Sequence, residues 1–181
     1  MSLQDYGVIT APDTVRIERM LPGPIERVWA YLTEPDKRAT WLAGGSLDLR
    51  PGGAMTLVFH NDKLASGDDA PPAKYEKYAG EIATTAHVIA CEPPRLLCHT
   101  WGEGSGTSSE VRFELTPHGD KVRLVLTHRR LPNRDETLSV SGGWHVHLDI
   151  LAARLEGRVP LSIWRSLAIV EPEYDRRLPR A

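Results

Sequence analysis

The residues best suited to chemistry are histidines, of which the chain has seven. His128 continues an alternating apolar row, Val122, Leu124 and Leu126, and is therefore predicted to face the interior at the end of a strand. His147 lies on the apolar stripe of a predicted helix, where its ring could approach that of His128. A buried imidazole can act as a general acid or base. The alternative, which we favour, is a structural histidine hydrogen-bonded to the backbone.

Metal binding is a weaker interpretation of the histidines. His145 and His147 are two positions apart, so a helix directs their side chains to different sides, whereas paired ligands on a helix are normally four apart. We therefore predict neither a metal site nor a cofactor.

The sequence lacks the local signatures of catalysis. It contains no Gly-x-Ser-x-Gly elbow, no Cys-x-x-Cys, no phosphate-binding loop and no dinucleotide fingerprint. Ser139 and Ser141 precede Gly142-Gly143 without a recognisable base at a fixed spacing. We assign no catalytic residue, although an acid–base enzyme assembled from distant residues would leave no such signature.

Five tryptophans form the other distinctive set: Trp29, Trp41, Trp101, Trp144 and Trp164. A buried Trp removes about 150–250 Å² from water, and its truncation to Ala costs about 3–5 kcal/mol. Core packing is the expected role of Trp29. Trp41 and Trp144 each adjoin a glycine pair at a predicted helix end, so that lining a pocket mouth and plain packing are equal alternatives for them.

Two cysteines flank a strong turn signal. Cys91 and Cys98 lie on either side of Glu92-Pro93-Pro94-Arg95, and a hairpin there would place the thiols opposite or nearly opposite each other on neighbouring strands. Because a bridge between adjacent strands strains disulfide geometry, we predict two buried free thiols.

The first half of the chain alternates strand and helix patterns, separated by Pro and Gly. It ends in a long polar segment, Asn61–Lys77, whose composition favours disorder over a functional lid. The predicted elements are a strand at Thr14–Met20, a helix from Pro24 to Thr33, a short helix at Pro35–Leu42, and a hairpin of Ser46–Arg50 with Ala54–His60.

The second half predicts an antiparallel sheet followed by a long helix. One apolar face along the strands requires a cover, which the stripe Trp144, His147, Leu148, Leu151 and Leu155 can supply. A further short helical segment is expected between Pro160 and Pro172. The predicted strands are Tyr78–Cys91, Leu96–Trp101, Glu110–Leu115 and Val122–Arg129, and the helix runs from Gly142 to Glu156.

Composition is that of a globular protein. Hydrophobic residues make up 41% and charged residues 25% of 181, a length that suits one domain over residues 1–181. A net charge of −2, with both signs spread along the chain, predicts no nucleic-acid partner. The lack of a long apolar run and of a leader-like N-terminus predicts no membrane association and a cytoplasmic location.

Several short motifs together resemble a known family. Gly80-Glu81-Ile82, Cys91–Leu96 with its Pro-Pro-Arg-Leu, Thr100-Trp101 and Gly143-Trp144 are similar, in this order, to the bacterial branch of the activator of heat-shock-protein 90 ATPase homologue family. That family lies in the START-like, or SRPBCC, superfamily of helix-grip proteins. The eukaryotic activators have a separate N-terminal domain, which 13 residues before the first strand cannot supply, so we do not favour a co-chaperone role.

The resemblance covers about residues 14–157 and implies an α+β helix-grip fold. A curved antiparallel sheet of about six to seven strands is expected to wrap around the long C-terminal helix, with two short helices after the first strand and a ligand cavity between sheet and helix. Residues 158–181 are expected to form an extension that packs on the domain or on a partner. Members include binders of hydrophobic ligands and cyclases.

We therefore expect the protein to bind an apolar small molecule, in a stress or metabolite response. The alternatives are a cyclase or hydrolase with His128 or His147 as general base, and a protein-interaction module or co-chaperone-like homodimer that uses the apolar segment around Trp164. The residues expected to line the cavity are Trp41, Met55, Leu57, Phe59, Phe113, Leu126, His128, Trp144, His147 and Leu151.

Overall fold

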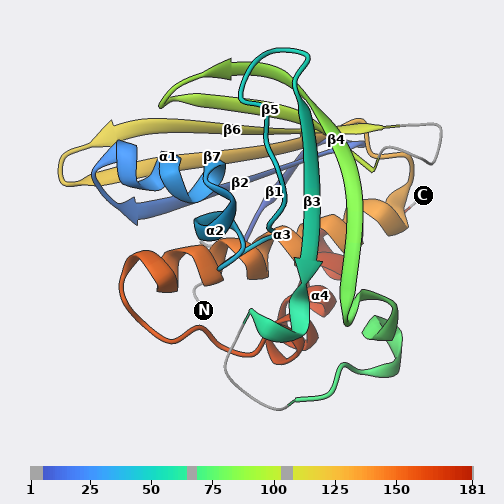
Figure 1. The fold of residues 1–181 in the computed structure, drawn as a ribbon. Helices are drawn as coiled ribbons and strands as arrows, with labels where there is room; N and C mark the ends of the chain where they lie inside the picture. Colours follow the sequence, from blue (N-terminus) through green and yellow to red (C-terminus); the bar gives the residue numbers. More distant parts are fainter. Residues whose placement is uncertain (1–5, 65–68, 103–107, 181) are drawn as a thin grey trace.

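A computed structural model of the protein describes residues 6–64, 69–102 and 108–180. Across these ranges, seven antiparallel strands form one curved sheet in the order β1-β2-β7-β6-β5-β4-β3 (Figure 1). The strands are β1 (Val8–Ala11), β2 (Thr14–Pro22), β3 (Ala54–His60), β4 (Glu81–Glu92), β5 (Leu96–Trp101), β6 (Ser109–His118) and β7 (Lys121–Arg129). The helices are α1 (Ile25–Thr33), α2 (Pro35–Arg38), α3 (Arg134–Leu155) and α4 (Ile163–Arg177), with 3-10 helices η2 (Asn61–Lys63) and η3 (Ala73–Tyr78).

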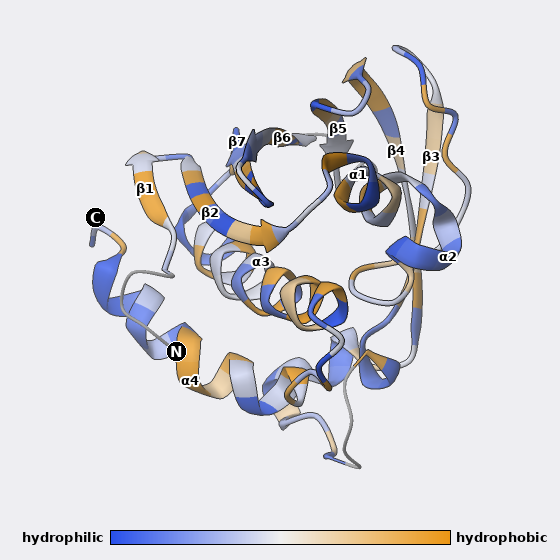
Figure 2. Cartoon of the chain, turned by 90° about the vertical axis from the view of Figure 1, so that its left-hand side faces the viewer, coloured by the Kyte–Doolittle hydropathy of each residue, from blue (hydrophilic) through white to orange (hydrophobic). Residues whose placement is uncertain are grey.

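Alternation along the strands gives the sheet one apolar face, as the sequence predicted. In β6 and β7, Phe113 pairs with Leu126 and Val111 pairs with His128, and all four side chains are buried. Arg112, between the two β6 residues, is exposed on the other face because successive strand residues point in opposite directions. The buried face is the one that α3 covers (Figure 2).

Helix α3 begins at Arg134, so the prediction that it begins at Gly142 is wrong. The side-chain oxygen of Asn133 caps it by accepting a hydrogen bond of 2.8 Å from the backbone N–H of Glu136. Gly142 and Gly143 instead lie inside the helix, where each costs about 1 kcal/mol relative to Ala. Packing of α3 between the sheet and α4 offsets this local cost.

Helix α4 covers the side of α3 that faces away from the sheet (Figure 2). The prediction that this segment is short and stops before Pro172 is wrong, because α4 continues through Pro172 to Arg177. As a consequence, α3 is buried on several sides. His145, Val146 and Ile150 are buried together with the predicted stripe Trp144, His147, Leu148, Leu151 and Leu155.

A buried polar network fixes α4 to α3. The Tyr174 hydroxyl accepts a hydrogen bond of 2.7 Å from the Gly7 backbone N–H and lies 3.0 Å from Nδ1 of His145. One turn further along α3, Asp149 binds Nε and Nη2 of Arg19 on β2. Burial raises the pKa of Asp149, but the interactions with His145 and Arg19 outweigh it, so that the pKa lies below its ordinary value.

The turn after α2 is built around a buried arginine. Nε of Arg38 donates to the Ala43 carbonyl oxygen over 2.9 Å, and Nη2 donates to the carbonyl oxygens of Gly44 and Gly45. Gly45 has φ +95°, and a Cβ there would lie 2.3 Å from the Thr56 carbonyl oxygen, so only glycine fits. These contacts end the helix at Arg38, earlier than the predicted Leu42.

The N-terminal half differs from the prediction at two further points. β1 was not predicted and pairs with the predicted first strand, β2. The segment Ser46–Arg50, predicted as a strand, contributes only the isolated bridge between Leu47 and Met55. β3 therefore pairs mainly with β4, along its whole length from Ala54 to His60.

The described parts of the polar segment Asn61–Lys77 are ordered, so the prediction of disorder is wrong for them. They form η2 and η3, and Tyr75 in η3 is buried. Its ring stacks on that of Trp164 in α4, with the centroids 6.1 Å apart. Residues 65–68 lie outside the described residues.

The two cysteines are free, as predicted, but they do not face each other. Cys91 pairs with Leu97 and Cys98 pairs with Ala90, an offset of one residue that directs the two thiols to opposite faces of the sheet. Cys98 is buried, but Cys91 is only half-buried, so the prediction of two buried thiols is wrong for Cys91. Burial raises the pKa of both thiols, with Glu92 adding to the shift at Cys91 and Glu110 at Cys98.

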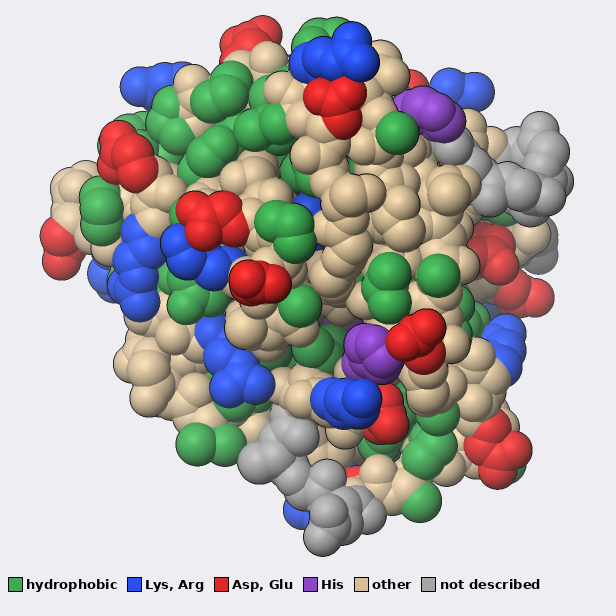
Figure 3. Space-filling model, in the orientation of Figure 1, with side chains coloured by type: hydrophobic (Ala, Val, Ile, Leu, Met, Phe, Trp, Pro, Cys, Tyr) green, Lys and Arg blue, Asp and Glu red, His purple; other side chains and the backbone are tan. Residues whose placement is uncertain are grey.

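The architecture is the α+β helix-grip fold that the sequence predicted. On the face shown in Figure 3, acidic and basic side chains are interspersed rather than gathered by sign. None of the helices in the described part of the chain has the length and apolar composition needed to span a bilayer.

Candidate functional site

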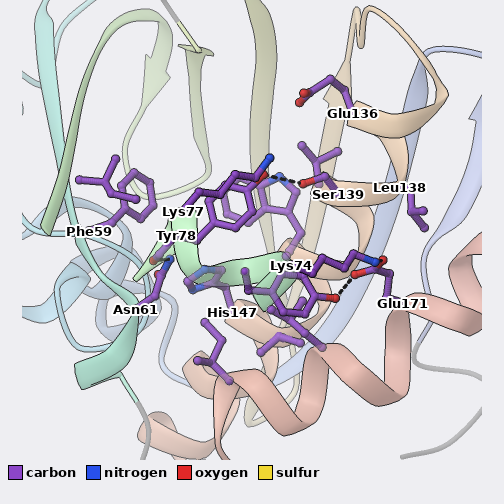
Figure 4. Close-up of a pocket in the computed structure, with 18 of the residues that line it drawn as sticks. Phe59, Asn61, Lys74, Lys77, Tyr78, Glu136, Leu138, Ser139, His147 and Glu171 are labelled. Atoms are coloured by element: carbon purple, nitrogen blue, oxygen red, sulfur yellow. Dashed lines mark hydrogen bonds and ion pairs between the residues drawn. The ribbon is translucent and has the colours of Figure 1, made fainter. Parts of the chain in front are cut away.

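A pocket of about 540 Å³ lies between one end of the sheet, η3, α3 and α4. Figure 4 shows side chains from these elements gathered around it, with Glu136 set apart from the others. The sheet and the loops beside it contribute Leu42, Phe59, Asn61, Ile82, Thr84, Trp101 and Gly102, and η3 contributes Lys74, Tyr75, Lys77 and Tyr78. The helices contribute Asp135, Glu136, Leu138, Ser139, Val140, Gly143, Trp144, Val146, His147, Ile163, Trp164, Leu167 and Glu171.

Aromatic rings form one wall of the pocket. The ring centroids of Trp101 and Trp144 are 4.9 Å apart, and Phe59 meets Trp101 edge to face at 5.8 Å. Such rings offer large apolar surfaces together with a weakly polar face and edge. This wall therefore favours contact with another ring or an apolar chain.

His128 holds Trp144 in place from behind this wall. The Trp144 indole N–H donates a hydrogen bond of 2.9 Å to Nδ1 of His128, so the proton of the neutral imidazole is on Nε2. Nε2 lies 2.6 Å from the Ser109 hydroxyl oxygen and donates to it. Burial, with a smaller contribution from His99, lowers the pKa of His128 to about 3. Both ring nitrogens are engaged, so His128 has the structural role that we favoured, with side-chain partners instead of the backbone.

His147 reaches the pocket itself. Its Nδ1 lies 2.8 Å from the Trp41 carbonyl oxygen, and because a carbonyl oxygen only accepts, Nδ1 carries the proton. Burial lowers the pKa of His147, and the bond to Trp41 opposes this only in part. The ring is therefore neutral at pH 7, with a lone pair on Nε2. The two rings bind different partners: His128 contacts Trp144 and Ser109, whereas His147 contacts the backbone of Trp41.

The η3 segment closes another side of the pocket through contacts to three elements. The Asn61 side-chain amide donates to the Tyr78 carbonyl oxygen over 3.1 Å, and the Tyr78 hydroxyl lies 3.5 Å from Oγ of Ser139 on α3. The ammonium of Lys74 and the hydroxyl of Tyr75 both bind the carboxylate of Glu171 on α4 (Figure 4). Desolvation, with a smaller effect of Tyr78, raises the pKa of Tyr75.

The predicted cavity residues divide into two groups. Phe59, Trp144 and His147 line the pocket. The other seven do not contribute to its wall and are at most 2% exposed, in the interior between the sheet, α1, α2 and α3; they are Trp41, Met55, Leu57, Phe113, Leu126, His128 and Leu151. Trp41 contacts the pocket only indirectly, through its carbonyl bond to His147.

The sequence did not identify the part of the wall that η3 and α4 provide. Tyr75 comes from the segment interpreted as a polar loop and Trp164 from the C-terminal extension. Tyr78 was predicted to begin a strand, but it is the last residue of η3. The available signal was a pair of tyrosines within four residues at the end of an otherwise polar loop, because exposed loops seldom need aromatic side chains.

The described ranges contain no group of three or more His, Cys, Asp or Glu side chains that is arranged to hold a metal ion. His145 and His147 point to different sides of α3, as their spacing predicted: one ring contacts Tyr174 and the other the backbone of Trp41.

Fold and pocket together define a START-like protein of the helix-grip type. More particularly, the chain belongs to the family of activator of Hsp90 ATPase homolog 1-like proteins, whose model matches residues 22–156. A comparison with curated proteins gave no significant match.

Solved structures agree with this assignment. A Bordetella parapertussis protein, solved by NMR in solution, is 48% identical over 97% of this chain and 91% of its own, with a TM-score of 0.81. CalU16 from Micromonospora echinospora is 22% identical over 91% of this chain and 87% of its own, with a TM-score of 0.66 for the crystal structure. A Nitrosomonas europaea protein is 19% identical over 82% of this chain and 97% of its own, with a TM-score of 0.63. The last two share the fold alone.

Proposed function

We propose that the protein binds an apolar small molecule in the pocket between the sheet, η3, α3 and α4. The observation that carries the proposal is a volume of about 540 Å³ walled by aromatic rings, within the range that small ligands occupy. Phe59, Trp101 and Trp144 offer water few hydrogen bonds. An apolar occupant would therefore replace this water with a gain in free energy.

A larger side chain in place of Gly143 of α3 can fill the pocket without disturbing the core, and the neighbouring Gly142 provides a control position. A Cβ at Gly143 would meet no atom within 4 Å, whereas one at Gly142 would contact Leu167 at 3.6 Å. Alanine at either position should stabilise α3 by up to about 1 kcal/mol. A leucine in place of Gly143 would extend into the pocket that this residue lines.

The test is calorimetric titration of 2-methoxynaphthalene into the wild type and into Gly143→Leu, with Gly142→Ala as the matched control. The wild type and the control should bind with equal affinity and a negative heat-capacity change, and Gly143→Leu should bind at least about tenfold more weakly. Thermal unfolding verifies that each variant is folded. Undiminished binding by Gly143→Leu would place the ligand elsewhere. No binding by the wild type of 2-methoxynaphthalene or of its hydroxyl analogue 2-naphthol, up to the solubility of each, would overturn the proposal.

Catalysis is a second candidate, favoured by the neutral imidazole of His147. Its Nε2 could accept a proton from a bound substrate. The lowered pKa of His147 makes it a weak base, and none of the described carboxylates contacts its ring, so binding is the function that we prefer. His147→Gln should abolish any turnover that the wild type shows while 2-methoxynaphthalene still binds; unchanged turnover would exclude the role.

Self-association stays a prediction, but the structure shows that Trp164 is not a suitable position at which to test it. Trp164 is only 4% exposed and stacks on Tyr75, so its replacement would damage the pocket wall. Leu161 and Ile169 are the exposed apolar residues of the same segment, at 71% and 60%. If the wild type forms a dimer through this segment, Leu161→Lys with Ile169→Lys should sediment as a monomer, and a wild type that is itself monomeric would exclude the homodimer.

A further inference from the structure

His147 presents a hydrogen-bond acceptor to a pocket that has one aromatic wall. The proton of its ring lies on Nδ1, which donates to the Trp41 carbonyl oxygen over 2.8 Å. Nε2 has no hydrogen-bond partner among the described residues. With the Nδ1 edge of the ring turned to Trp41, the edge that carries Nε2 is the part left to contact a ligand, and Figure 4 shows the ring among the residues around the pocket.

The two cations that line the pocket have contacts within the protein. The Lys74 ammonium binds Glu171, and the Lys77 ammonium lies 4.8 Å from the centre of the Tyr78 ring. Asp135 and Glu136, in the first turn of α3, are exposed. A ligand carboxylate placed at Nε2 of His147 would face a lone pair with no proton to donate, and burying its charge without a partner would be costly. The ligand group that best suits Nε2 of His147 is therefore an uncharged hydrogen-bond donor.

The arrangement of the aromatic rings in the wall favours one kind of ligand scaffold to carry this donor. Trp101 and Trp144 are tilted by 54° to each other, and Phe59 stands at 77° to Trp101, so faces and edges of rings alternate along the wall. Planar rings gain about 0.5–1.5 kcal/mol in such offset and edge-to-face pairs beyond the area they bury, which a flexible alkyl chain does not. Ordering an alkyl chain would also cost conformational entropy.

We propose that the pocket selects planar aromatic molecules that carry one uncharged hydrogen-bond donor, a hydroxyl or N–H, which donates to Nε2 of His147. This inference rests on the proposed function and specifies the ligand class. An apolar ligand without a donor would bury the Nε2 lone pair unpaired, at a cost that the donor avoids. The recognition element is a histidine held in one tautomer by a backbone carbonyl.

The experiment compares 2-naphthol with 2-methoxynaphthalene, in which a methyl group replaces the donor proton, by calorimetric titration at pH 7. The wild type should bind 2-naphthol about tenfold more tightly. In His147→Phe the ratio of the two affinities should fall to about one. Both affinities are measured in the same variant, so any general loss of stability affects them equally and cancels in the ratio. Sodium decanoate serves as the probe of the competing class, aliphatic carboxylates.

Each outcome decides a separate point. Equal affinities of the two naphthalenes for the wild type would overturn donor recognition and leave the proposed function intact. A tenfold ratio that persists in His147→Phe would show that His147 is not the acceptor and would overturn its role. Decanoate bound more tightly than 2-naphthol would overturn the aromatic class. Binding of neither naphthalene would overturn the proposed function itself.

Discussion

The indole N–H of Trp144 donates a hydrogen bond of 2.9 Å to Nδ1 of His128, and this contact links α3 to β7. Trp144 also lines the pocket, so the orientation of a wall residue depends on a histidine that does not reach the pocket. The bond requires an unprotonated Nδ1. Protonation of His128 should therefore both destabilise the fold and disturb the pocket wall.

Acid should destabilise the protein through its buried histidines. Burial lowers the pKa of His128 to about 3 and that of His99 to about 4, whereas both titrate near 6.5 when unfolded. At pH 7 the two histidines are mainly neutral in both the folded and the unfolded protein, so their titration contributes little to the free energy of unfolding. Between about pH 6.5 and 4 the unfolded chain holds a proton at each position that the folded protein lacks, so the free energy of unfolding falls by about 1.4 kcal/mol per pH unit and histidine. Urea denaturation at pH 7.0, 6.0 and 5.0 measures this.

The control for the pH dependence is His128→Gln. Its amide can accept from Trp144 and donate to Ser109, but it does not titrate. The slope of unfolding free energy against pH should decrease by about one proton, or 1.4 kcal/mol per unit, relative to the wild type. An unchanged slope would mean that His128 does not carry the effect.

Tyr174→Phe should weaken the attachment of α4. Loss of the hydroxyl leaves the Gly7 N–H and Nδ1 of His145 without their partner in a buried region, at a cost of about 2–3 kcal/mol. Urea denaturation at pH 7 gives the value. Tyr31→Phe is the comparison, because its hydroxyl bonds to none of the residues that the structure describes, and it should change stability by less than about 0.5 kcal/mol. Equal effects of the two changes would contradict the role of the Tyr174 network.

Arg38→Lys should be costly although it keeps the charge. The guanidinium of Arg38 is 1% exposed and binds the carbonyl oxygens of Ala43, Gly44 and Gly45 from two of its nitrogens, which an ammonium cannot reproduce. Desolvation lowers the pKa of Arg38 to about 10 and would weigh more on a buried lysine. We expect a loss of about 2–4 kcal/mol in urea denaturation. The exposed Arg95→Lys should be nearly neutral, and a similarly small loss for Arg38→Lys would refute this account.

Local sequence patterns alone determined much of the sheet and the family. Two of these patterns are the alternation along β6 and β7 and the turn at Glu92–Arg95. Both depend on residues close together in the chain, and the structure contains the strands and the turn that they predict. The stripe from Trp144 to Leu155 is helical for the same reason. These features are encoded by spacing, because strand and helix periods fix which side chains share a face.

Only the tertiary structure decided where α3 begins, which way each cysteine points and what walls the pocket. Gly142-Gly143 favours a break locally, but contacts with the sheet and α4 override that preference. The pocket is lined by residues that lie far apart in the chain, such as Phe59, Trp144 and Trp164, and no short-range pattern encodes their proximity. The tautomer of His147 likewise depends on a carbonyl oxygen 106 residues away.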